Sequence, residues 1–155
     1  MSQTNRTPLQ VALIYGLVAG VALGVSEVAL GLLIGLAPYP LAILFGRLTL
    51  VVLILAYLYA GYQAARRTGN LYAGTAAGAL TGAFGVLTVI ALFYLSSFFH
   101  TYLFFDPAFL LIPASLPLTS TLASPLVNLV LTFAVYGAIV GTLGGLIGKR
   151  RSLHS

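Results

Sequence analysis

The chain has 155 residues, of which 60% are hydrophobic and 6% are charged, and its mean hydropathy is +1.07. A soluble domain carries about 25% charged residues, so this composition excludes an ordinary soluble protein and favours one domain, residues 1–155, inside a lipid bilayer. The net charge of +5 comes from short basic clusters at the edges of apolar runs. Such clusters are typical of topology signals, and we expect no nucleic-acid partner.

The first predicted transmembrane helix covers residues 9–36, which exceeds the roughly 20 residues that cross the bilayer core. A signal peptide is the alternative, because Arg6 and the apolar run 11–24 imitate its charged and apolar regions. However, the apolar run continues well past the 7 to 15 residues of a signal core, which favours a helix that stays in the membrane.

The second predicted helix, residues 41–63, follows a tight break at Pro38 and Pro40. Proline disfavours helix in the preceding residue and suits a first helical turn, so the first two helices should form a short hairpin. The second helix ends at the basic pair, Arg66 and Arg67, and Gly69 should provide the stop.

The third and fourth predicted helices cover residues 71–97 and 125–148, and the fourth is followed by a basic cluster, Lys149 to Arg151. With four helices, Arg6, the Arg66 and Arg67 pair and this terminal cluster all fall on one side of the membrane. Cytoplasmic loops are enriched in Lys and Arg, so we expect both termini in the cytoplasm and the protein in the cell (inner) membrane.

Residues 98–124 are the main ambiguity, because their aromatic and apolar content would suit a fifth helix or a re-entrant segment. Asp106, Pro107, Pro113 and Pro117 argue against a helix there, and a fifth span would move the terminal basic cluster outside. We therefore expect an external loop whose aromatic rings lie at the membrane boundary.

Three of the four predicted helices carry glycines at a strict spacing of four. These stripes are Gly16, Gly20 and Gly24; Gly74, Gly78 and Gly82; and Gly137, Gly141 and Gly145. Such a stripe allows close approach of a second backbone, as in a glycine zipper, although glycine is also simply frequent in membrane helices. We expect the first, third and fourth helices to form a tight core and the leucine-rich second helix to be more exposed. The pattern leaves open whether the stripes pack within one chain or between copies.

Glu27 is the only acidic residue in a predicted span, and ionisable groups there are costly enough to be functional candidates. Arg47 is its obvious partner, because both residues lie at similar distances from the Pro38 turn. An ion pair that locks the first two helices together is the favoured hypothesis. Alternatively, Arg47 reaches the headgroups while a protonated Glu27 bonds a residue such as Thr81, or Glu27 binds a proton, a cation or a cationic substrate.

The types of residue that most catalytic and cofactor sites need are missing or scattered. There is no cysteine, and the two histidines, His100 and His154, are too far apart for a helical ligand pair. No phosphate loop, nucleophile elbow or zinc signature occurs either. We therefore expect no catalytic residue, no metal, no cofactor and no enzyme activity.

The stretch from Ala60 to Gly69, AGYQAARRTG, followed by the stripe of Gly74, Gly78 and Gly82, resembles small multi-span bacterial and archaeal membrane proteins of unknown function. In those proteins a helix ending in a basic turn precedes a glycine-striped helix. The resemblance implies a topology and no activity.

Two functional hypotheses follow. The favoured one is a structural or assembly component that associates with itself or with a larger membrane complex through its glycine faces and the leucine-rich second helix. The other is a small oligomeric transporter or channel for a proton, a cation or a small molecule, using Glu27.

Overall fold

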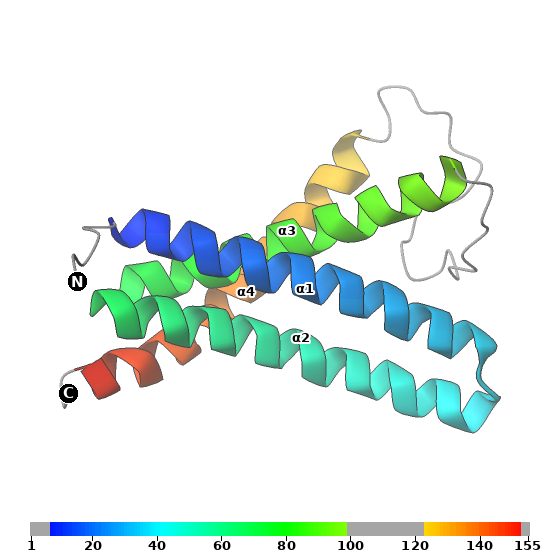
Figure 1. The fold of residues 1–155 in the computed structure, drawn as a ribbon, viewed down its shortest axis with the longest axis horizontal. Coiled ribbons are helices and arrows are strands. Elements are labelled where there is room, and N and C mark those ends of the chain that lie inside the picture. Colours follow the sequence, from blue (N-terminus) through cyan, green and yellow to red (C-terminus); the bar gives the residue numbers. More distant parts are fainter. Residues whose placement is uncertain (1–6, 99–122, 153–155) are drawn as a thin grey trace, which may run out of the picture.

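The computed structural model describes residues 7–98 and 123–152, and these form four α-helices joined in an antiparallel succession (Figure 1). The helices are α1 (Pro8–Leu36), α2 (Tyr39–Thr68), α3 (Leu71–Phe98) and α4 (Ala123–Ser152). Each contains an apolar stretch long enough to cross a membrane. The predicted all-helical class with four candidate membrane spans is therefore confirmed. The predicted external loop, or fifth span, at residues 98–124 lies almost wholly outside the described residues.

The helix ends follow from local sequence. Thr7 caps α1 through a reciprocal capping box, in which its hydroxyl accepts from the Gln10 backbone while the Gln10 side chain accepts from the Thr7 backbone. Helix α2 ends at Gly69, which adopts the left-handed conformation with φ of 65°. Because Gly69 supplies the stop, α2 runs on through the basic pair to Thr68, five residues beyond the predicted Gln63.

The two ends of the bundle differ. At the end that holds the start of α1, the α2–α3 turn and the end of α4, all four helices lie close together (Figure 1). We call this the closed end. At the opposite end, the α1–α2 pair and the α3–α4 pair diverge, and we call this the forked end.

Large apolar side chains cover the outside of the bundle, and small ones fill its inside. The core cluster at the closed end is built mostly from alanines that are completely buried, namely Ala12, Ala60, Ala64, Ala73 and Ala77. In contrast, leucines, isoleucines and valines of every helix are exposed on the surface. Soluble proteins rarely expose an apolar surface this continuous, whereas the hydrocarbon tails of a bilayer are apolar themselves and can surround it.

The order of packing differs from the predicted core of the first, third and fourth helices. Helices α2 and α3 each contact all three other helices, but no Cα atoms of α1 and α4 approach within 8 Å in the part of the chain that the structure describes. Helix α2 packs closely on α4 instead. The physical reason is a run of small residues near the end of α2, Ala60, Gly61, Ala64 and Ala65, which offers a face as flat as a glycine stripe.

Candidate functional site: a cavity between two helix pairs

The contact between α1 and α3 positions the first wall of the site. The two helices run in the same direction, and Gly16, Gly20 and Gly24 lie against α3 at successive turns. A methyl group added at Gly16 would lie 2.5 Å from Cβ of Leu80, and one at Gly20 would lie 2.6 Å from Cβ of Phe84. No side chain larger than hydrogen fits at these positions without moving the helices apart.

Helices α2, α3 and α4 meet backbone to backbone at the closed end. A methyl group at Gly78 of α3 would strike the carbonyl oxygen of Gly137 and lie 2.7 Å from Cα of Gly141. One at Gly61 of α2 would also lie 2.7 Å from Cα of Gly141. Gly141 is thus in close contact with two helices at once, which leaves no room for a passage between them.

Bulkier residues replace the close-packing glycines toward the forked end. On α4, the residues that follow the stripe in that direction are Phe133 and Leu129, and on α3 they include Val86 and Val89. Because these side chains cannot bring backbones together as glycine does, the two helix pairs separate there.

A partly open cavity of about 210 Å³ lies in the fork. All four helices line it. The lining residues are Leu23, Glu27, Gly31, Ile34 and Gly35 of α1, Thr49 and Leu53 of α2, Gly82, Gly85, Val86 and Val89 of α3, and Leu129 and Phe133 of α4. The α1 lining extends from Leu23 to within one residue of the helix end, a rise of about 18 Å. The cavity therefore reaches from mid-bundle toward the forked end.

The described part of the cavity wall holds one ionisable group and one hydroxyl. Glu27 provides the carboxylate, and its Oε1 is buried without a hydrogen-bond partner. The hydroxyl is that of Thr49, which donates to the backbone oxygen of Phe45 at 3.1 Å, one turn back on its own helix. Every other lining residue is apolar or glycine.

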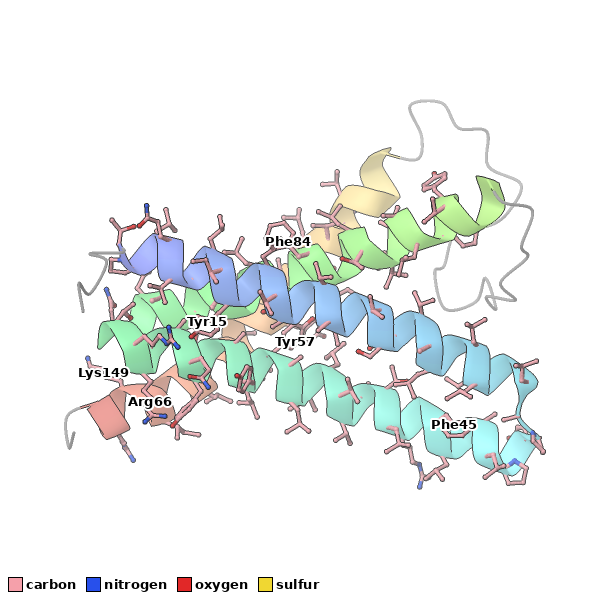
Figure 2. The ribbon with its side chains drawn as sticks, viewed as in Figure 1. Tyr15, Phe45, Tyr57, Arg66, Phe84 and Lys149 are labelled. Atoms are coloured by element: carbon pink, nitrogen blue, oxygen red, sulfur yellow. The ribbon has the colours of Figure 1, made fainter. Side chains whose placement is uncertain are left out.

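Tyr57 of α2 is a second buried polar group without a partner. Its ring is fully buried near the centre of the bundle (Figure 2), and its hydroxyl has no hydrogen-bond partner among the described residues. Tyr57 does not line the cavity. The described interior thus contains two polar groups without a partner, of which only Glu27 belongs to the cavity wall.

The structure does not bring Glu27 and Arg47 together. Arg47 is exposed on α2, and no ion pair or hydrogen bond joins the two side chains in the described residues. The alternative partner is engaged elsewhere, because the Thr81 hydroxyl donates to the backbone oxygen of Ala77 at 2.8 Å. Neither partner that the sequence suggested for Glu27 therefore bonds it.

Sequence reasoning missed the rest of the cavity wall. Thr49, the only other polar lining residue, gave a weak signal as a hydroxyl inside an apolar run. Phe133, Val86 and Leu53 gave no signal, because ordinary apolar residues become a binding surface only when helices diverge around them. Of the nine striped glycines only Gly82 lies in the wall, together with Gly31 and Gly35, which continue the stripe of α1, and Gly85.

The described residues contain no group of three His, Cys, Asp or Glu side chains that could hold a metal ion. Comparison with known proteins does not indicate a function for the cavity, since no family model, no curated protein and no solved structure matches the chain.

Basic side chains gather at the closed end, away from the cavity. Arg66 and Lys149 both lie there (Figure 2). The Arg67 guanidinium lies over the ring of Tyr15, 5.3 Å from its centroid, and so joins the end of α2 to the start of α1. The two ends of the bundle therefore differ in chemistry as well as in shape.

Proposed function

We propose that this multi-pass membrane protein is a small transporter or channel that binds a proton, a cation or a small molecule at Glu27. The observation that carries the proposal is that Glu27, whose Oε1 has no hydrogen-bond partner, lines a cavity formed by all four helices. A carboxyl group inside the hydrocarbon region is costly, and a group retained there without a protein partner calls for a ligand or a proton to satisfy it.

The assembly hypothesis that the sequence favoured loses its main support. It needs glycine faces that are free to receive another chain. Each of the nine striped glycines instead has atoms of a neighbouring helix of the same chain within contact distance of an added methyl group. We infer that the stripes serve packing within one chain. The exposed leucines of α2 need no protein partner in a bilayer, because lipid tails are as apolar as leucine.

The proposal includes an orientation. The basic residues of the closed end favour the cytoplasmic side by the positive-inside rule, which places both termini in the cytoplasm and the forked end outside. A ligand would then reach Glu27 from the outer side of the cell membrane. To cross, it would have to pass the contacts at Gly61, Gly78 and Gly141, so transport requires these helices to move.

Reconstitution into liposomes tests the proposal. Fluxes of protons, alkali cations and small organic cations are measured for the wild type, for Glu27→Gln and for Ser26→Ala. Ser26 is the matched control, because it neighbours Glu27 but its hydroxyl bonds only the backbone of its own helix, at Ala22 and Leu23, and it does not line the cavity.

We expect a flux above that of empty liposomes in the wild type and in Ser26→Ala, and its loss in Glu27→Gln. Gel filtration and circular dichroism establish that each variant is folded. Equal flux in Glu27→Gln and the wild type, or no flux of any tested ion in the wild type, would remove the proposal.

A further inference from the structure

We infer that the ligand of this cavity is a lipophilic monovalent ammonium ion, above all a tertiary one with a single N–H group and an aromatic or short alkyl body. This inference rests on the proposed function and names the class of ligand that the same site would take. It is argued from the charge, the hydrogen-bonding groups and the size of the cavity.

Charge is the first constraint. Among the described residues, Glu27 is the only ionisable one in the wall, so these residues give the ionised site one negative charge, which a monocation neutralises. An anion would be repelled. A zwitterion such as an amino acid would bring a second carboxylate that has no cation to meet it, since Arg47 is exposed and does not line the cavity. A dication would leave one charge uncompensated in an apolar wall.

Hydrogen bonding is the second constraint, and it separates ammonium ions from metal ions. Calcium takes six to eight oxygen ligands and magnesium demands an octahedral set, whereas this wall offers one carboxylate and the Thr49 hydroxyl. A tertiary ammonium ion has one N–H donor. The Glu27 carboxylate, which lines the cavity, can accept it, and no polar group of the ligand is then left unsatisfied.

Size and wall composition are the third constraint. A dry cavity of 150 Å³ lined by Leu, Ile and Phe is known to hold benzene, and the cavity described above is larger, about 210 Å³, and partly open. Leu23, Leu53 and Val86 provide aliphatic contacts, and Phe133 provides an aromatic ring. An aromatic ring with a dimethylaminomethyl group is a ligand of suitable size, since part of it can extend through the opening.

Four compounds isolate these features in binding measurements on the purified protein in lipid nanodiscs. N,N-dimethylbenzylammonium is the predicted ligand. Isobutylbenzene has nearly the same shape without the charge or the donor, and benzyltrimethylammonium keeps the charge without the donor. Phenylalanine is the zwitterion. Sodium and magnesium chloride test metal ions.

We expect N,N-dimethylbenzylammonium to bind more tightly than either isobutylbenzene or phenylalanine by on the order of 10- to 100-fold, the worth of one charge-assisted hydrogen bond. Benzyltrimethylammonium should bind with intermediate affinity, and the metal ions should neither bind nor compete. Glu27→Gln should lose the preference for the charged compound, and Ser26→Ala should keep it.

Two further variants protect the test against misfolding of Glu27→Gln. Glu27→Asp keeps the charge on a shorter side chain and should retain a weaker preference for the cation. Val89→Phe adds bulk to the cavity wall while leaving Glu27 in place, and it should reduce the affinity for both the ammonium ion and isobutylbenzene.

The outcomes separate the inference from the proposed function. If flux depends on Glu27 but is carried by protons or sodium, and the tertiary ammonium ion neither binds nor competes, the proposed function stands and the ligand class is wrong. If the ammonium ion binds equally to the wild type and to Glu27→Gln, the ligand class is also wrong. If no flux of any kind depends on Glu27, the proposed function fails and the inference fails with it.

Discussion

Replacing Gly78 by alanine should weaken the bundle by an amount that the geometry allows us to bound. The added methyl group would lie 2.7 Å from Cα of Gly141, whereas ordinary van der Waals contact begins at 3.4 Å, so α3 and α4 must separate by at least about 0.7 Å. A gap of that size forfeits a quarter to a half of the dispersion energy of the facing atoms, and overpacking of this kind costs about 1–3 kcal/mol.

Gly46→Ala is the matched control, because Gly46 also lies inside a helix but has nothing within 4 Å of an added methyl group. Both variants gain about 1 kcal/mol of helix propensity, so the difference between them isolates the contact with α4. The free energy of unfolding is measured by circular dichroism in mixed micelles as denaturing detergent is added. We expect Gly78→Ala to be less stable than Gly46→Ala by about 1–3 kcal/mol. Equal stability of the two variants would refute the close packing of α3 on α4.

The same unfolding assay checks three further predictions. Tyr57→Phe should raise the free energy of unfolding by about 1 kcal/mol, because it removes a buried hydroxyl that has no partner. Tyr57→Ala should lower the free energy of unfolding by about 3–5 kcal/mol, because it opens a cavity. A destabilised Tyr57→Phe variant would mean that the hydroxyl is hydrogen-bonded. The Thr75 and Thr142 hydroxyls lie 2.8 Å apart between α3 and α4, so a double-mutant cycle with valine at both positions should give a coupling of about 0.6 kcal/mol; no measurable coupling would argue against this bond. Arg47→Leu should leave the free energy of unfolding unchanged or raise it by up to about 2 kcal/mol, because Arg47 is exposed on the outside of the bundle. A free energy of unfolding lower by about 3–5 kcal/mol would instead reveal a buried ion pair with Glu27.

The number of helices and most of their ends could be predicted from the sequence, because they depend on local properties. Apolar runs longer than the bilayer core separated by Pro38 and Gly69 leave few alternatives to helices that end there. The predicted end of α2, Gln63, is five residues early, because the chain stays helical through the basic pair, Arg66 and Arg67, up to Thr68.

The choice of neighbours among the helices could not be predicted, because several helices offer equally flat faces. The glycine stripe of α1 packs on α3 at Leu80 and Phe84, whereas the small residues of α2 around Gly61 pack on α4 at Gly141. The pattern of small residues in one helix does not determine which helix packs against it, because that choice depends on the shapes of all four helices.

The candidate site was predictable only in its chemistry. Glu27 was singled out because an acid within an apolar helix is costly, and that argument needs no knowledge of its surroundings. The cavity depends on where close packing between the two helix pairs stops, and its wall runs from Gly82 to Val89 on α3 and from Phe133 to Leu129 on α4. That is a property of the assembled bundle. The predicted pairing with Arg47 rests on the depth of the two residues and does not take into account the face of α2 on which Arg47 lies.

Modification of Glu27 by a hydrophobic carbodiimide tests the central claim, that this acid is unpartnered and faces a cavity of ligand size. Asp106 is the only other side-chain carboxyl in the sequence, so mass spectrometry of peptides assigns each adduct without ambiguity. We predict an adduct on Glu27 that forms more slowly when N,N-dimethylbenzylammonium is present and at an unchanged rate when sodium chloride replaces it. A Glu27 that stays unmodified in the folded protein, or one that reacts equally fast with and without the ammonium ion, would contradict the account.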